Sequence, residues 1–240
     1  MNFLYVWHFG LLARLSETGS VEPTLYFILI GVCAVVAYLL GSINSAVLIS
    51  TRIYHDDIRK HGSKNAGMTN MMRVFDKKAG GLTLLFDALK AIVAGIVCAV
   101  LLGDDGIAVS MLFCMLGHMF PVYFKFRGGK GVVVTAASLL LLDPLTFVVV
   151  VGIFLIIVLM TKYVSLGSIM SALLFPLLYI RIAVITPFGR HDLPGAVPTI
   201  VSVFVAFLIV IMHWANIKRL LAGEESKTYL FGKDKNKEQK

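Results

Sequence analysis

Long apolar stretches separated by short polar loops occupy most of the chain between positions 25 and 215. A helix needs about 20 mostly apolar residues to cross the hydrocarbon core of a bilayer. The pattern therefore predicts an all-α, polytopic membrane bundle of seven transmembrane helices. The predicted helices cover residues 25–50, 80–102, 107–126, 131–142, 144–161, 164–186 and 197–215.

The fourth and fifth stretches are separated only by Asp143 and Pro144, so one long helix over 131–161 is an alternative. We favour two helices joined by a turn. Proline suits the first position of a helix, where its missing N–H would have no intrahelical partner anyway. An aspartate in the middle of a bilayer is costly, and a turn at the membrane surface avoids that cost.

The composition excludes an ordinary soluble domain. The 240 residues are 58% hydrophobic and only 15% charged, whereas soluble domains carry about 25% charged residues. Mean hydropathy is +0.85. The cysteines at positions 33, 98 and 114 all lie inside apolar stretches. This placement favours small buried side chains over a disulfide framework.

Basic residues concentrate in alternate loops. The formal net charge is +8, and Lys and Arg gather in segments 51–79 and 125–130 and in the C-terminal tail. The loops around Asp104, Asp105 and Asp143 are acidic instead. The positive-inside rule then predicts an outside N-terminus and a cytoplasmic C-terminus. Membrane lipid explains this distribution better than nucleic acid, which is not an expected partner.

The chain divides into three parts on these grounds. Residues 1–22 are an N-terminal extension, residues 23–222 a transmembrane domain, and residues 223–240 a polar C-terminal tail. The extension lacks the basic start of a signal peptide. An amphipathic surface segment and a misassigned start codon both remain open as its explanation.

Glycine, small polar side chains and bases recur at the helix ends of the predicted cytoplasmic face. Glycine lets backbone N–H groups approach an oxyanion, and a helix N-terminus adds partial positive charge. Ser, Thr and Asn supply neutral hydrogen bonds, and Lys and Arg supply charge-assisted ones. Capping and packing explain the residues at any single helix end. All of these helix ends lie on the same predicted face, however, which favours a site for phosphorylated substrates. The candidate phosphate-binding residues are Gly62, Ser63, Asn65, Gly67, Thr69, Asn70, Gly128, Gly129, Gly131, Ser165 and Ser168.

Some titratable residues within the apolar stretches are candidates for a chemical role. Asp87 and Lys90 are three positions apart, which places them on one face of a helix. They are either a structural ion pair or a direct substrate contact. His118, near the end of the third predicted helix, is a candidate general base or a hydrogen-bonding scaffold.

Several catalytic signatures are absent from the sequence. It has no Gly-x-Ser-x-Gly nucleophile elbow and no His-Glu-x-x-His zinc motif. It has no cluster of Cys, His, Asp and Glu with metal-ligand spacing. The His-x-x-x-x-Asp signature of the common glycerolipid acyltransferases is also missing.

Six motifs follow one another between Gly41 and Leu220. By order and number they resemble the bacterial membrane glycerol-3-phosphate acyltransferases that use acyl phosphate as donor, the PlsY family. The chain departs from the family pattern at Asn44, where proline is usual, at Lys64, where glycine is usual, and at Trp214, where arginine is usual. The motifs are Gly-Ser-Ile at 41–43, Asp-Ile-Arg-x-x-Gly-Ser-x-Asn-x-Gly-x-Thr-Asn at 57–70, Gly-His-x-Phe at 117–120, Gly-Gly-Lys-Gly at 128–131, Tyr-Val-Ser-Leu-x-Ser-Ile at 163–169 and His-x-x-Asn-Ile-x-Arg-Leu at 213–220.

The resemblance implies transfer of a fatty acyl group from acyl phosphate to the 1-hydroxyl of sn-glycerol 3-phosphate, without cofactor, metal or acyl-CoA. The products would be lysophosphatidic acid and phosphate. The site would face the cytoplasm from the bacterial inner membrane. Arg59 and Lys130 would bind phosphates and stabilise departing charge, and Ser42 and Asn216 would orient the glycerol or the carbonyl oxygen. His118 would be a base or, as we favour, an orienting hydrogen-bond donor.

Two other functions compete with this interpretation. A transporter of phosphorylated metabolites also needs basic groups, but near the bilayer midplane on broken helices and often with inverted repeats. A non-catalytic lipid-binding membrane protein needs only one-sided basic loops. The sequence leaves open whether an enzyme that produces acyl phosphate is a partner, and it gives no oligomeric state.

Overall fold

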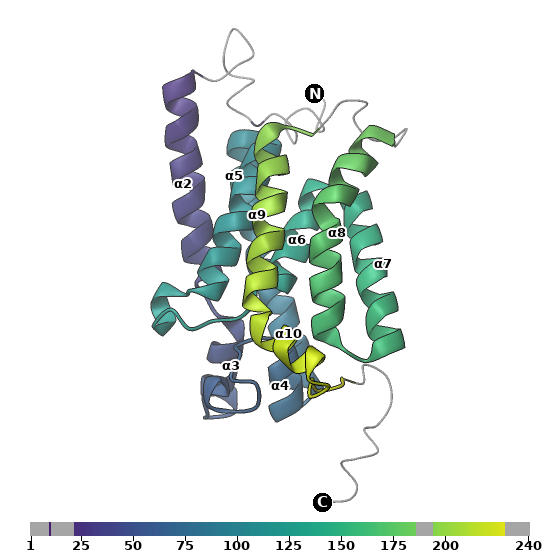
Figure 1. Cartoon of the computed structure of the whole chain (residues 1–240). Coiled ribbons are helices and arrows are strands. Elements are labelled where there is room, and N and C mark those ends of the chain that lie inside the picture. Colours follow the sequence, from purple (N-terminus) through teal and green to yellow (C-terminus); the bar gives the residue numbers. More distant parts are fainter. Residues whose placement is uncertain (1–9, 11–21, 186–193, 229–240) are drawn as a thin grey trace, which may run out of the picture.

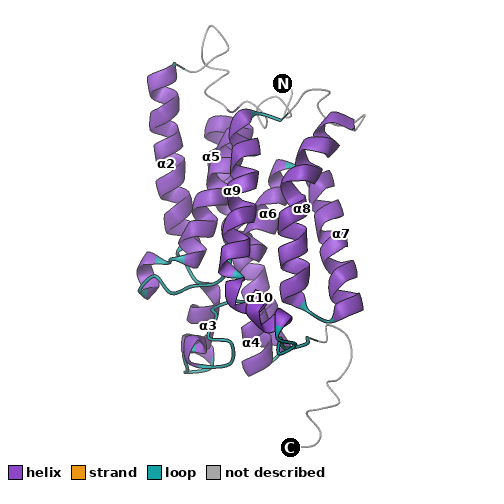
Figure 2. Ribbon diagram, in the orientation of Figure 1, coloured by secondary structure: helices purple, strands orange, loops and turns teal. Residues whose placement is uncertain are grey.

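The computed structural model describes residues 10, 22–185 and 194–228, and every regular element in this part of the chain is helical (Figures 1 and 2). The all-α prediction is therefore confirmed. The elements are α2 (Pro23–Gly41), α3 (Ser45–Ile53), η1 (Ile58–Lys60), α4 (Met68–Val74), α5 (Lys77–Met119), η2 (Val122–Phe124), α6 (Val132–Leu142), α7 (Pro144–Thr161), α8 (Val164–Ile185), α9 (Ala196–Met212) and α10 (Trp214–Leu221).

The long helices present apolar side chains outward. Four described helices are long and apolar enough to cross a membrane, or five if α9 and α10, which meet at a bend of 56°, form one span. Only 11% of the most apolar window of α7 is buried within the protein. Lipid is the solvent that suits such a surface, because contact between so many apolar side chains and water would cost much free energy.

Helix α5 is a hairpin of two antiparallel limbs. Leu102 and Gly103 leave the helical conformation, and Gly103 has a φ of 57°. Beyond this break the chain folds back, so that a Cβ on Gly106 would lie 2.1 Å from the carbonyl oxygen of Cys98. Glycine is required there because the two backbones touch. The separate helices predicted for 80–102 and 107–126 correspond to these limbs, although the second limb ends earlier, at Met119.

The apolar stretch 25–50 lies within one candidate membrane span, Pro23–Ile53, but it is not one continuous helix, which corrects the prediction. Helix α2 ends at Gly41, and α3 begins at Ser45. The Asn44 side chain accepts a hydrogen bond from the Val47 N–H at 3.0 Å, which caps α3 and stabilises the break. A Cβ on Gly41 would lie 2.2 Å from the Cys114 carbonyl oxygen, so α2 packs against the second limb of α5 at its very end.

The turn between α6 and α7 lies where the sequence predicts it. The Asp143 carboxylate accepts hydrogen bonds from the N–H groups of Leu145 and Thr146, each at 3.0 Å. Pro144 occupies the first position of α7. The alternative of one helix over 131–161 is therefore excluded.

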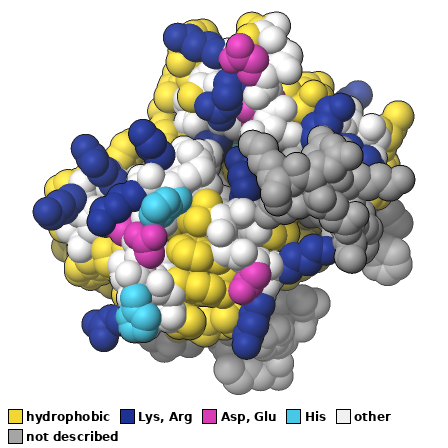
Figure 3. Space-filling model, turned by 90° about the horizontal axis from the view of Figure 1, so that it is seen from below, with side chains coloured by type: hydrophobic (Ala, Val, Ile, Leu, Met, Phe, Trp, Pro, Cys, Tyr) yellow, Lys and Arg dark blue, Asp and Glu magenta, His cyan; other side chains and the backbone are white. Residues whose placement is uncertain are grey.

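The short elements α3, α4, α10, η1 and η2 gather at one end of the bundle, the lower end in Figure 1. Seen from below, this end carries many Lys and Arg side chains (Figure 3). At the opposite end the Tyr26 hydroxyl donates to Asp105 at 2.8 Å. The core of the bundle lies between these ends, where mostly apolar side chains of α2, α5, α6, α8 and α9 pack together.

Candidate active site

A polar cavity of about 420 Å³ opens at the lower end of the bundle. It lies among the 62–70 loop, α4, both limbs of α5, the start of α6, the start of α8 and the α9–α10 junction. Most of the candidate residues from the sequence line it. These are Gly62, Ser63, Asn65, Gly67, Thr69, Asn70, His118, Lys130, Gly131, Ser165, Ser168 and Asn216.

The 62–70 loop is built around the buried side chain of Asn70. Its amide nitrogen donates to the carbonyls of His61 at 3.1 Å and Asn65 at 3.0 Å, and its oxygen accepts from the Ser63 N–H at 3.0 Å. Gly62, with a φ of 56°, lies so close that a Cβ would be 2.3 Å from that oxygen. In this structure Asn70 therefore holds the loop that borders the cavity.

The start of α6 borders the cavity without a capping side chain. Gly131, with a φ of 80°, is the N-cap residue and makes no side-chain cap. Gly131, Val132 and Val133 line the cavity. The first N–H groups of a helix have no intrahelical acceptor and carry partial positive charge, which favours an anion beside them.

A network of side chains joins α6, α8 and α10 across one wall of the cavity. The Lys130 ammonium donates to the side-chain oxygen of Asn216. The Glu225 carboxylate accepts from Asn216 at 2.6 Å, from the Ser165 hydroxyl at 2.8 Å and from Arg219 at 2.7 Å. Three donors that suit a phosphate thus surround a carboxylate of the protein itself.

The residues of this network have shifted pKa values. Burial lowers the pKa of Lys130 to about 8, and the nearby Glu225 carboxylate partly opposes that shift. Burial alone would raise the pKa of Glu225. Hydrogen bonds from Asn216, Arg219 and Ser165 outweigh burial, and the pKa of Glu225 is lowered. Glu225 is therefore anionic near neutral pH.

Among the cavity-lining residues that the sequence reasoning missed, three are charged: Arg73, Arg219 and Glu225. Arg219 was part of the last motif, so its place there was the available signal. Glu225 lies in the predicted tail, and one of its partners, the Ser165 hydroxyl, is 60 positions away in the sequence. Segment 223–228 follows α10 and turns toward α8, where the Thr228 N–H donates to the Lys162 carbonyl at 2.8 Å.

His118 lies beneath the Gly128–Gly129 turn. The Gly129 N–H donates to the His118 carbonyl at 3.1 Å, and the Gly128 N–H donates to the Met119 carbonyl at 3.1 Å. A Cβ on Gly129 would lie 2.1 Å from Nε2 of His118. These two glycines do not line the cavity; they let the loop close against the histidine.

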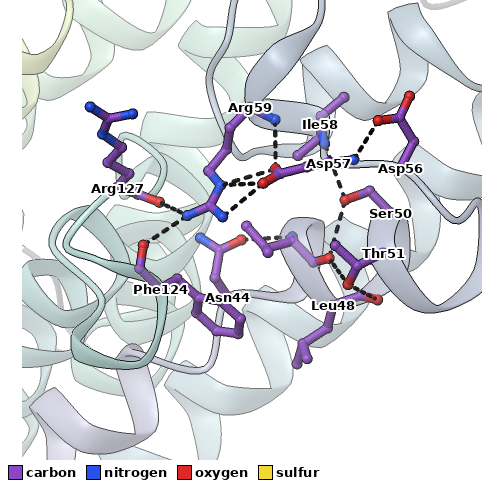
Figure 4. Close-up of polar contacts among 11 residues, drawn as sticks. Asn44, Leu48, Ser50, Thr51, Asp56, Asp57, Ile58, Arg59, Phe124 and Arg127 are labelled. Atoms are coloured by element: carbon purple, nitrogen blue, oxygen red, sulfur yellow. Dashed lines mark hydrogen bonds and ion pairs between the residues drawn. The ribbon is translucent and has the colours of Figure 1, made fainter.

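Arg59 and Ser42 are not among the residues that line the cavity. The Arg59 guanidinium pairs with the Asp57 carboxylate at 2.8 Å and donates to the Phe124 carbonyl at 2.7 Å (Figure 4). It thereby ties η1 to η2, and its hydrogen bonds to the Asp57 carboxylate hold the pKa of Asp57 below its ordinary value. The Ser42 hydroxyl accepts from the Val122 N–H at 3.4 Å.

An apolar groove lies beside the polar cavity, between α2, α3 and the first limb of α5. Its volume is about 480 Å³. Lys90 lines this groove, while its partners Asp87 and His118 line the cavity. The apolar side chains of the groove are Leu40, Ile43, Leu48, Ile49, Ile53, Phe86, Leu89 and Val93.

Comparison with known proteins gives a consistent result. Residues 31–223 match the family model described as glycerol-3-phosphate acyltransferase. A glycerol-3-phosphate acyltransferase of Finegoldia magna is 40% identical over 210 residues, which cover 85% of this chain and 96% of the relative. One of Clostridioides difficile is 37% identical over 202 residues, covering 82% and 94%.

The fold is similar to that of solved structures. The glycerol 3-phosphate form of PlsY, an integral membrane glycerol 3-phosphate acyltransferase, superposes with a TM-score of 0.73 and 30% identity. The match covers 83% of this chain and 96% of that one. The lysophosphatidic acid form of PlsY gives a TM-score of 0.71.

Proposed function

Because this chain belongs to the glycerol-3-phosphate acyltransferase family, we propose that it moves a fatty acyl group from acyl phosphate to sn-glycerol 3-phosphate. The acceptor is the 1-hydroxyl, and the products are lysophosphatidic acid and inorganic phosphate. The membrane-embedded bundle suits this reaction, since one substrate and one product carry a long acyl chain.

The observation that carries the proposal is the polar cavity beside the apolar groove. Both substrates bear phosphate, and the cavity offers Lys130, Ser168 and the uncapped start of α6 as partners for it. The groove offers an apolar bed for the acyl chain. The reacting carbonyl then lies where cavity and groove meet, near the Asp87–Lys90–His118 cluster.

Acyl phosphate needs little chemical activation, because it is a mixed anhydride with a good leaving group. The glycerol oxygen attacks the carbonyl carbon, and the bond from that carbon to the bridging oxygen breaks. The electron pair leaves with the phosphate. A phosphate oxygen of the substrate accepts the hydroxyl proton, so no covalent intermediate with the protein is required. The protein accelerates the step by positioning and charge stabilisation.

The roles of individual residues follow from their places. Lys130 binds phosphate and stabilises the departing charge, and Asn216 orients the substrates beside it. Ser165 and Ser168 support the phosphate from α8. Arg59 and Ser42 act at a distance from the cavity in this structure, since each holds the η2 turn that precedes the Gly128–Gly129 loop.

The placement in the membrane is part of the proposal. Counting α2, the two limbs of α5, α6, α7, α8 and α9 gives seven crossings, with an outside N-terminus and a cytoplasmic C-terminus. The basic lower end would then face the cytoplasm of a bacterium. The acyltransferase domain is residues 23–222; the extension 1–22, apart from residues 10 and 22, and most of the tail lie outside the described residues.

A transfer assay tests the function. Purified protein receives glycerol 3-phosphate with either palmitoyl phosphate or palmitoyl-CoA, in the presence of a chelator. We expect lysophosphatidic acid from the phosphate donor only. No product from either donor, with protein shown to be folded, would refute the proposal, and uptake of phosphate esters into vesicles would then test the transporter alternative.

A further inference from the structure

Three titratable side chains meet inside the α5 hairpin. Asp87 and Lys90 lie one turn apart on its first limb, and His118 lies near the end of its second. All three are buried, with 2%, 8% and 4% of their surface exposed. A buried charge is tolerated only where it is paired and hydrogen-bonded, so the arrangement of partners here is informative.

The Lys90 ammonium has three protons and no lone pair. Three acceptors surround it: the Ile43 carbonyl at 2.8 Å, the Asp87 carboxylate at 2.9 Å and Nδ1 of His118 at 3.0 Å. Because an ammonium can only donate, Nδ1 of His118 must accept. The proton of the neutral imidazole is then on Nε2.

Nε2 is the free edge of the ring. It lies against Gly129, and His118 is one of the residues that line the polar cavity. Within the part of the chain that the structure describes, Nε2 has no hydrogen-bond partner. A protonated nitrogen without a protein acceptor at the cavity wall is suited to donate to a bound oxyanion.

A general base at this position conflicts with the same contacts. To accept a proton at Nε2, the neutral ring would need its own proton on Nδ1, pointing at the Lys90 ammonium 3.0 Å away. The Asp87 carboxylate oxygen also faces Nδ1, but at 3.6 Å it is too far to accept a hydrogen bond from it. A protonated ring would place a second positive charge 3.0 Å from that ammonium, and repulsion between like charges at this distance is strong in a buried site.

We propose that Asp87 and Lys90 are positioning residues that hold His118 as the Nε2–H tautomer, so that it donates a hydrogen bond to substrate and does not act as a base. The Asp87 carboxylate pairs with the Lys90 ammonium at 2.9 Å, and Lys90 fixes the ring. The identity of the oxygen that accepts from Nε2, on the acyl phosphate, rests on the proposed function. The tautomer does not.

The tautomer is measurable directly. Full-length protein labelled with 15N-histidine in lipid nanodiscs gives ring-nitrogen shifts that separate protonated from unprotonated nitrogens, and His118→Gln identifies the signals of His118. We expect Nδ1 unprotonated and Nε2 protonated near neutral pH. A protonated Nδ1 would overturn the proposal whether or not the protein has acyltransferase activity.

Kinetics test the positioning role. Asp87→Leu combined with Lys90→Met removes both charges together, so no unpaired charge is left in the core. We expect kcat to fall by about a hundredfold, as when one preorganised donor is lost, with little change in KM for glycerol 3-phosphate and with mixed tautomers of His118. Wild-type kcat in this variant would refute the positioning role. If the variant does not fold, the tautomer of the unaltered protein still decides.

The two failures are distinguishable. A protein that shows the Nε2–H tautomer but forms no lysophosphatidic acid contradicts the proposed function alone. A protein that forms product with Nδ1 protonated contradicts the positioning proposal alone.

Discussion

Two lysines at the lower end of the bundle, Lys90 and Lys130, differ in what surrounds their ammonium groups. Lys90 contacts a carbonyl, a carboxylate and an imidazole nitrogen of the protein. Among the described residues Lys130 bonds only to the Asn216 oxygen, and it borders the cavity. An ammonium with fixed acceptors organises the protein, whereas one with protons to spare is suited to a ligand.

The largest effect is expected when Lys90 is replaced. Lys90→Met leaves Asp87 buried without its cation, and removing one partner of a buried pair costs about 3–5 kcal/mol. We expect a large drop in the thermal unfolding temperature in detergent. The Asp87→Leu, Lys90→Met variant should lose much less stability. Equal losses in the two variants would show that the pair does not act as a unit.

Lys130→Ala removes the ammonium that borders the cavity. We expect kcat/KM for glycerol 3-phosphate to fall by about 10²–10³-fold, the loss typical of one electrostatic donor at a reacting centre, while the unfolding temperature changes little. Lys60→Ala, which removes an exposed lysine of η1 at the same end, is the matched control. A loss of less than tenfold would exclude Lys130 from the phosphate site.

The titration of Lys130 should give the reaction a pH dependence. Burial lowers the pKa of Lys130 to about 8. Below that pH the side chain is cationic and attracts phosphate; above it the side chain is neutral. We therefore expect kcat/KM to decline as pH rises through about 8. Lys130→Arg should remove this decline, because a guanidinium stays charged. A decline that persists in Lys130→Arg would belong to another group.

The smallest effect concerns the acid beside Lys130. Glu225 raises the pKa of Lys130, so removing its charge with Glu225→Gln should lower that pKa further. The alkaline decline of kcat/KM should then begin at lower pH, as measured by a pH–rate profile. Glu224→Gln, at the exposed neighbouring position, should leave the profile unchanged. Movement of the profile to higher pH would contradict the described electrostatics.

The sequence predicts those parts of the fold that depend on local pattern. The apolar stretches locate the helices, and Asp143 with Pro144 marks the turn between α6 and α7 because cap and proline act on adjacent backbone groups. The family and most residues of the cavity also follow from the motifs. The motifs identify these cavity residues because the motifs lie at or next to helix ends.

Other side-chain contacts were beyond such reasoning, whether the partner lies near or far in the sequence. Arg59 was expected at a phosphate, but Asp57, two positions earlier, pairs with its guanidinium. Glu225 reaches the cavity only because segment 223–228 turns toward α8. The break at Asn44 was hidden inside a continuous apolar stretch, since one capping side chain is enough to interrupt it when the neighbouring helix allows close approach.

The polar cavity and the apolar groove lie side by side, with Lys90 between them. This arrangement gives the two products separate exits, one toward water and one toward lipid. Under the proposed function, inorganic phosphate is soluble only on the aqueous side and leaves through the cavity. Lysophosphatidic acid has an apolar acyl chain, so it leaves laterally along the groove into the bilayer. Each turnover then deposits new lipid in the membrane without passing it through water, and the departure of one product does not obstruct the other.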